Sequence, residues 1–145
     1  MLVKQLLRSK NPQVWTVTPD TSVYETLQMM ADKNVGALVV VEADKVVGII
    51  SERDYARKVI LQGKSSMHVP VKDIMTDRVF WVTPEYTIEQ CMAVMTDRRI
   101  RHLPVLDDDK LVGIVSIGDV VKAIISDQEF MIEQLEKYIV GGGQI

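Results

Sequence analysis

The chain has 145 residues, of which 47% are apolar and 26% are charged, and its formal net charge is −3 at pH 7. This size fits one compact domain or two very small ones that share a core. The acidic balance argues against a general nucleic-acid binder, which usually carries a basic excess on one face, and the single cysteine, Cys91, excludes an internal disulfide.

No segment of the sequence is typical of a signal peptide or a membrane span. The run from Met1 to Arg8 is too short and too interrupted by charge for a signal peptide. The longest apolar run, Ala37 to Val41, is far below the roughly 20 residues that a membrane-spanning helix needs. We therefore expect a soluble protein of the reducing cytoplasm.

The sequence contains two copies of one unit at a fixed offset of 65 residues. Val17-Thr18-Pro19 recurs as Val82-Thr83-Pro84, and Gly48-Ile49 recurs as Gly113-Ile114. Matches in one register indicate a duplicated structural unit. We predict a helical segment at 1–13, a first repeat at 14–61, a linker at 62–70, a second repeat at 71–126, and a helical extension with a tail at 127–145.

In chain order, each repeat predicts a β-α-β-β-α unit. The first repeat has a strand at 14–17, a helix from 22, strands at 37–41 and 46–50, and a helix from 51. A polar turn joins the second and third strands, which suits a hairpin. Because a unit this small is marginal alone, the predicted fold class is α/β (α+β), with two repeats packed sheet to sheet in pseudo-two-fold symmetry.

The first helix of each repeat has a start signal and one apolar face. Ser22 with Glu25, and Thr87 with Gln90, have the spacing of a capping box. The residues that follow recur at i, i+3, i+4 and i+7, which predicts a buried stripe. These residues are Val23, Thr26, Leu27 and Met30 in the first repeat and Ile88, Cys91, Met92 and Met95 in the second.

A Ser-x-x-Asp motif follows the last strand of each repeat, as Ser51 to Asp54 and as Ser116 to Asp119. One interpretation is structural, because this spacing is itself a capping box. The other is nucleotide binding. A helix start offers N–H groups and a positive dipole end to phosphate, and a carboxylate one turn later can accept both hydroxyls of a ribose.

A basic segment occurs in the second repeat only. Arg98, Arg99, Arg101 and His102 lie where the first repeat has mostly neutral residues. They suit either a solvated helix end, where cations favour the dipole, or a phosphate clamp, because guanidinium groups match phosphate oxygens. The two repeats should therefore not be equivalent.

An apolar helical stripe runs from Val120 to Ile139 near the C-terminus, and it is longer than one small unit needs for its own core. It could cover an open face of the same chain or form a contact between subunits. A shorter amphipathic helix is expected at Met1 to Lys10, with Leu2, Leu6 and Leu7 on one side.

Taken together, these motifs resemble a tandem pair of cystathionine β-synthase (CBS) domains, also called a Bateman module, in a short member without another domain. The motifs are Val17-Thr18-Pro19, 34–40 and 48–54 in the first repeat, and 73–76, Val82-Thr83-Pro84, 100–105 and 113–119 in the second. The resemblance implies binding of adenosine-containing ligands (AMP, ADP, ATP, NAD or S-adenosylmethionine) between the repeats, and a homodimer formed through helices.

The family's site positions are carried over residue by residue. Asp54 and Asp119 are the implied ribose ligands, and Ser51 and Ser116 are the hydroxyls near phosphate. Gly118 stands where the first repeat has Arg53, so the implied phosphate contacts differ between the repeats. The complete implied ligand-binding set is Val17, Ala37, Ser51, Arg53, Asp54, Val82, Arg101, His102, Pro104, Ser116 and Asp119.

The function that follows is a regulatory adenine-nucleotide sensor that acts on a separate, unidentified protein partner. We expect no catalysis, no catalytic cofactor and no metal, because the sequence shows no nucleophile–base pair, metal-ligand spacing or phosphate-binding loop. The alternative is a protein- or RNA-interaction adaptor with vestigial nucleotide sites, in which the basic segment would contact the partner.

Overall fold

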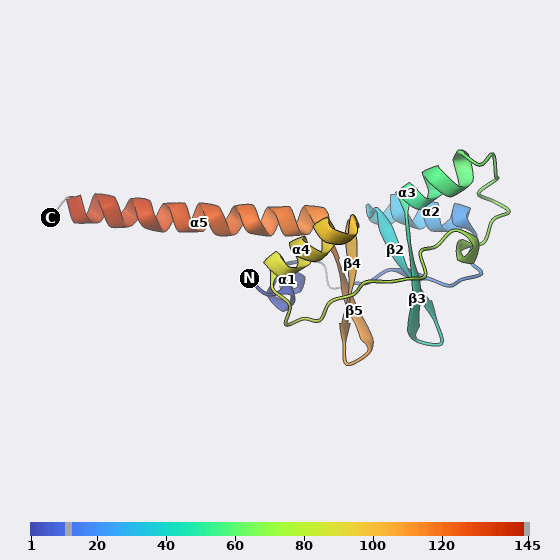
Figure 1. The fold of residues 1–145 in the computed structure, drawn as a ribbon, viewed down its shortest axis with the longest axis horizontal. Helices are drawn as coiled ribbons and strands as arrows, with labels where there is room; N and C mark the ends of the chain where they lie inside the picture. The colour runs from blue at the N-terminus through green and yellow to red at the C-terminus, as the bar shows by residue number, and fades with distance from the viewer. Residues whose placement is uncertain (11–12, 144–145) are drawn as a thin grey trace. The chain divides into compact units, whose positions relative to one another are not determined.

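The structure is a computed structural model that describes residues 1–10 and 13–143, with side chains as far as Ile139. It is a mixed α and β fold with a three-stranded sheet, a two-stranded sheet and flanking helices (Figure 1). The predicted fold class is therefore confirmed. The chain forms two compact units. The first-repeat unit comprises Gln13–Trp81 and Pro104–Gly113, and the second-repeat unit comprises Met1–Pro12, Val82–Leu103 and Ile114–Ile145.

The first-repeat unit contains the three-stranded sheet, in the order β1-β2-β3. β1 is parallel to β2, and β2 is antiparallel to β3 with a register shift between Val40 and Val41. The first strand is shorter than the predicted run 14–17. The elements are β1 (Thr16–Val17), α2 (Val23–Lys33), β2 (Ala37–Glu42), β3 (Lys45–Ser51), α3 (Glu52–Tyr55), a π-helical segment (Ala56–Ile60) and a 3₁₀ turn (Val71–Asp73).

The core of this unit lies between the sheet and the apolar face of α2. Leu38, Val40 and Ile50 from the strands are fully or almost fully buried, and they meet Val23 and Met30 from α2. Thr26 is the buried polar residue on the same face, and its hydroxyl donates to the Ser22 carbonyl at 2.9 Å. The predicted buried stripe is confirmed, and the internal hydrogen bond removes the cost of burying a hydroxyl.

The predicted linker is packed along the start of α2. The N–H of Val23 donates to the Val69 carbonyl at 2.9 Å, and that of Tyr24 donates to the Ser66 carbonyl at 3.0 Å. These bonds satisfy N–H groups that the first turn of a helix leaves without intrahelical partners. The predicted capping box at this end forms in part, because Ser22 Oγ accepts from Glu25 N–H but the described contacts include no return bond from Glu25.

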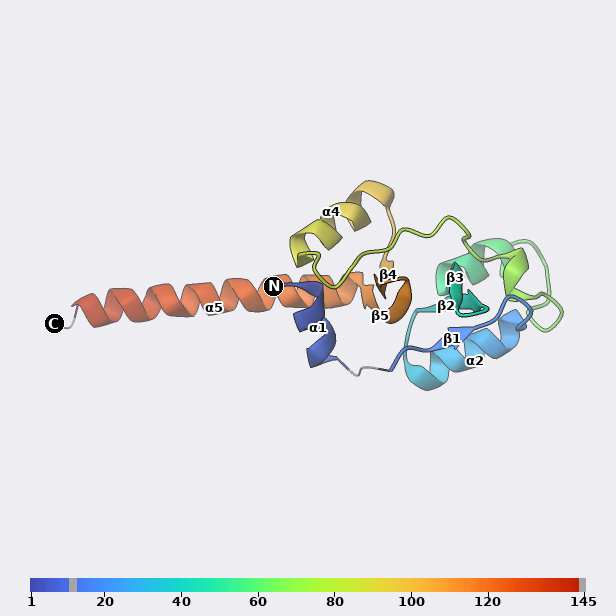
Figure 2. The same cartoon turned by 90° about the horizontal axis from the view of Figure 1, so that it is seen from below.

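The second-repeat unit packs α4 against α5 and places the N-terminal helix beside them (Figures 1 and 2). α1 is anchored by backbone bonds from Val3 N–H to the Tyr86 carbonyl at 2.8 Å and from Ile88 N–H to the Met1 carbonyl at 3.0 Å. The predicted capping box of Thr87 and Gln90 is complete. The unit's helices are α1 (Val3–Ser9), α4 (Ile88–Arg98) and α5 (Ile117–Gly143). The two-stranded sheet is formed by β4 (His102–Asp107) and β5 (Lys110–Ser116), of which Pro104–Gly113 are counted with the first-repeat unit.

α5 is 27 residues long, which confirms the predicted C-terminal helix. All side chains from Gln128 to Ile139 are exposed, although the stripe includes Ile132 and Leu135. Nothing in its own compact unit covers that part of the described helix. No helix in the described part of the chain is long and apolar enough to span a membrane.

Candidate functional site

The first Ser-x-x-Asp motif lies where β3 ends and α3 begins. Asp54 N–H donates to Ser51 Oγ at 3.3 Å, and Ser51 N–H donates to Asp54 Oδ2 at 2.9 Å. The predicted capping box is thus formed. The Ser51 hydroxyl also donates to Asp54 Oδ2 at 3.1 Å. The mutual hydrogen bonds therefore fix both side chains at the end of β3.

A lysine completes this first cluster. Lys58 Nζ lies 3.1 Å from Asp54 Oδ1 and donates to the Ile74 carbonyl at 2.9 Å. Lys58 is four residues after Asp54, on the π-helical segment that continues α3. A cation at this spacing is a short-range partner that needs no distant part of the chain.

The second motif repeats the cap at the start of α5. Ser116 N–H donates to Asp119 Oδ2 at 2.9 Å, and Asp119 N–H donates to Ser116 Oγ at 3.1 Å. The cation here comes from the N-terminal segment. Lys10 Nζ lies 2.5 Å from Asp119 Oδ2 and donates to the Ile114 carbonyl at 3.0 Å.

The charge state of Asp119 follows from these bonds. Burial acts to raise the pKa of its carboxyl, but hydrogen bonds from Lys10 and from Ser116 outweigh burial and hold the pKa below the usual range. Asp119 is therefore ionised at neutral pH.

His102 and Arg101 of the basic segment lie beside this second cluster, and their role as a phosphate clamp stays a prediction. Burial lowers the pKa of His102, and the positive charges of Lys10 and Arg101 lower it further, while Asp119 acts in the opposite direction. The Arg101 carbonyl accepts the N–H of Ile117 at 2.8 Å, which ties the start of β4 to the start of α5. The Arg101 side chain is exposed.

The remaining predicted site residues are divided between the two compact units. Ala37 is buried and pairs with Ser51 across β2 and β3, which puts it at the first cluster. Arg53 is exposed on α3, and Val17 is buried in β1 opposite Val40. Val82 and Pro104 are buried in different compact units, and their roles as ligand contacts stay predictions.

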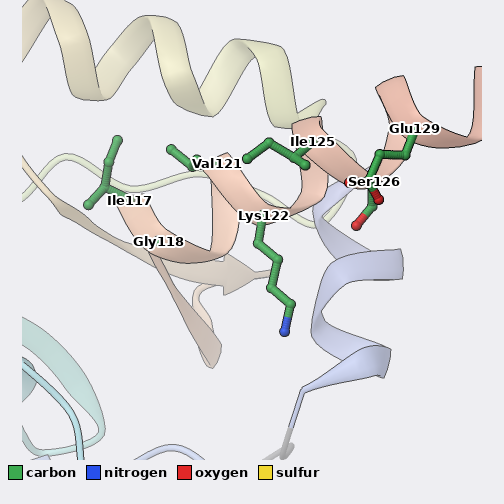
Figure 3. A pocket seen from close by; sticks show the side chains of 7 residues that line it. All are labelled: Ile117, Gly118, Val121, Lys122, Ile125, Ser126 and Glu129. Carbon is green, nitrogen blue, oxygen red and sulfur yellow. The ribbon is translucent and has the colours of Figure 1, made fainter. Parts of the chain in front are cut away.

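Neither the lysine partner of each aspartate nor a groove along α5 was predicted. Lys58 was recognisable from its i, i+4 spacing to Asp54, whereas Lys10 is 109 residues from Asp119 and no local pattern joins them. A groove of about 540 Å³ also runs along α5 (Figure 3), lined by Ile117, Gly118, Val121, Lys122, Ile125, Ser126 and Glu129. None of the predicted ligand-binding residues lines it, and three of its six lining side chains, Ile117, Val121 and Ile125, are apolar.

The fold and the duplicated clusters define the class of protein. A model of the CBS domain matches residues 3–61 and 71–126. The chain therefore belongs to the CBS domain family and carries a pair of these domains, which confirms the resemblance seen in the sequence. CBS domain pairs are regulatory modules, and no catalytic family is indicated.

Individual relatives agree with this assignment. A mitochondrial CBS domain-containing protein of Arabidopsis thaliana is 48% identical over 134 residues, and the match covers 89% of this chain and 65% of the relative. A solved structure of a protein with CBS domains from Burkholderia ambifaria is 49% identical, with a TM-score of 0.85 over 88% of this chain and 96% of that one. The CBS domain pair of protein MJ0100, solved with 5′-methylthioadenosine and S-adenosyl-L-methionine, is 28% identical with a TM-score of 0.77, covering 88% of this chain and 98% of that one.

Proposed function

We propose that the protein is a sensor that binds an adenosine-containing ligand (AMP, ADP, ATP, NAD or S-adenosylmethionine) at its two Ser-x-x-Asp clusters and passes the change to a separate protein partner. The observation that carries the proposal is the duplicated cluster, in which a partly buried aspartate lies at a helix start beside a serine and a lysine. The adenosine compounds bound by the CBS pair of MJ0100 support the choice of ligand class.

The chemistry of each cluster suits a ribose. An ionised carboxylate has two oxygens and can accept one hydrogen bond from each hydroxyl of a cis-diol. At the second cluster, the start of α5 and the Arg101 guanidinium add positive charge, which favours a phosphate on the same ligand. At the first cluster Arg53 is the exposed cation, and Gly118 replaces it in the second repeat. The two sites should therefore differ in preference for phosphate.

The test is calorimetric titration of nucleotide-stripped protein with AMP, ATP, NAD and S-adenosylmethionine. We expect Asp54→Asn and Asp119→Asn each to remove one binding event, because the amide cannot accept both ribose hydroxyls. Asp32→Asn, an exposed position on α2, is the matched control and keeps both events. Unchanged affinity in the correctly folded double variant contradicts the proposal.

The proposed role is non-catalytic. Incubation of the pure protein with ATP or NAD should give no product, and turnover would reassign the site. The predicted cytoplasmic location stays a prediction, and one relative is mitochondrial. Salt-dependent binding to oligonucleotides, with no nucleotide binding, would favour the adaptor alternative.

We also propose that the protein is a homodimer that associates through α5. The exposed stripe advances by four and then three residues along the helix, which is the spacing of a two-stranded coiled coil. Its apolar members flank one polar position, and the groove of Figure 3 begins at the same face. The stripe consists of Val121, Ile125, Gln128, Ile132, Leu135 and Ile139. A second copy offers the same pattern and would cover the half of α5 that its own unit leaves exposed.

A further inference from the structure

The two aspartates of the proposed ligand sites are neutralised in different ways. Asp54 pairs with Lys58, a neighbour on the same helical stretch. Asp119 pairs with Lys10, which lies beyond the end of α1. Ala123 occupies the position in the second repeat that corresponds to Lys58. The N-terminal segment therefore supplies a cation that the second repeat itself lacks.

The Lys10 contact is the shorter of the two pairs and its lysine is the more shielded, although Asp54 is the more buried of the two aspartates. Its Nζ is 2.5 Å from Asp119 Oδ2, and the side chains are 31% and 24% exposed. For Lys58 and Asp54 the distance is 3.1 Å, and the side chains are 44% and 15% exposed. At similar overall exposure, the shorter ion pair has the stronger electrostatic attraction.

Lys10 is held near Asp119 by contacts that do not involve the ion pair. Val3 and Leu6 of α1 are buried, and the backbone bonds of Val3 and Lys4 fasten the helix to Tyr86 and Pro84. When the ion pair between Lys10 and Asp119 breaks, the docked α1 keeps the Lys10 ammonium group close to the carboxylate. A tethered group of this kind competes as if it were present at a high local concentration.

Resting on the proposed function, we propose that Lys10 is an internal competitor for ligand at Asp119 and a determinant of the unequal affinities of the two sites. Ribose hydroxyls need the same carboxylate, and Oδ2 already accepts from both Lys10 and Ser116. The ligand must displace the ammonium before it binds. At Asp54, Lys58 contacts the other carboxylate oxygen at a longer distance and the lysine side chain is more exposed, so displacement is easier.

The affinity test uses adenosine, which has the ribose but no phosphate, in an Asp54→Asn background that leaves only the second site. We expect Lys10→Met to tighten adenosine binding about three- to tenfold, the factor that corresponds to a partly buried ion pair. Lys10→Arg keeps the cation and should keep the low affinity. Lys4→Met, an exposed lysine on the same helix, is the matched control and should change nothing.

A second measurement follows Lys10 itself in the protein with an unaltered Lys10. Saturating adenosine should make Lys10 react several-fold faster with an amine-acylating reagent, read by mass spectrometry, while Lys4 stays constant. Unchanged or weaker adenosine binding in Lys10→Met, or protection of Lys10 by adenosine, overturns the inference. If AMP binds more weakly to Lys10→Met while adenosine is unaffected, Lys10 is a phosphate contact and the competitor role is wrong. Absence of binding in every variant overturns the proposed function as well.

Discussion

The dimer proposed through α5 gives a prediction whose size can be worked from the exposed side chains. Ile132 and Leu135 are each 56% exposed. Shortening either to alanine removes three carbons, worth about 0.8 kcal/mol each when fully buried. Because only the exposed part of each side chain can be buried by a partner, each shortened side chain should weaken dimerisation by about 1 kcal/mol. The double variant changes four side chains in the dimer. We expect a loss of about 4–5 kcal/mol, or a dissociation constant raised about a thousandfold or more.

The assay is sedimentation velocity over a range of protein concentrations, with circular dichroism to show that α5 remains helical. Alanine is the chosen replacement because it favours helix. Phe130→Ala is the matched control, because Phe130 is 63% exposed but lies on the opposite side of α5 from the stripe. A monomeric wild-type chain, an unchanged association constant in the double variant, or an equal effect of Phe130→Ala would refute the reasoning.

Three further predictions concern packing, reactivity and pH. A Cβ at Gly48 would lie 2.6 Å from Met75 Sδ and 3.1 Å from the Thr76 carbonyl oxygen, so Gly48→Ala should cost about 1–3 kcal/mol in urea denaturation. Gly118→Ala meets nothing closer than 3.7 Å and should gain about 0.5–1 kcal/mol, and equal effects would contradict the packing described. Cys91 is fully buried, and burial raises the pKa of its thiol to about 11. Iodoacetamide at pH 8 should therefore label this thiol far more slowly in the native protein than in the unfolded one. Fast labelling of the native protein would show that the thiol is accessible to the reagent. Burial lowers the pKa of His102 below its ordinary 6.5, so the imidazole binds a proton more readily in the unfolded chain than in the folded one. The free energy of unfolding should therefore fall as the pH drops below about 6.5. His102→Gln should reduce this pH dependence of stability, and an unchanged dependence would show that other groups cause it.

The helices and hairpins were predictable because each carries its own local signal. The helix from Ile88 has a cap at Thr87 and an apolar face that includes Cys91, and both features agree with the structure. The duplication strengthened these signals, because a weak pattern that occurs twice at the same offset is no longer weak. The π-helical segment Ala56–Ile60 carried no such signal, since its hydrogen bonding depends on the packing around it.

The candidate site was predictable in its local part only. The serine and aspartate of each motif lie three residues apart, so their mutual bonds follow from the helix start. Lys10 reaches Asp119 because α1 docks on the second-repeat unit, and this is a property of tertiary packing. Nor did the sequence decide between the cap and ligand interpretations. The structure shows the caps, and ligand binding remains the proposal that titration tests.

The two repeats are more alike in backbone conformation than in side chains. Left-handed non-glycine residues occur in three pairs at the same offset, and the residue types differ in two of the pairs. They are Asn34, Ala43 and Asp44 in the first repeat and Arg99, Asp108 and Asp109 in the second. Asn and Asp tolerate this conformation, but Ala43 and Arg99 do not favour it, so the identical path at those two places reflects a shared frame. After the duplication, positions such as Arg53 and Gly118 therefore came to carry different side chains in the two repeats, while the path of the chain stayed the same.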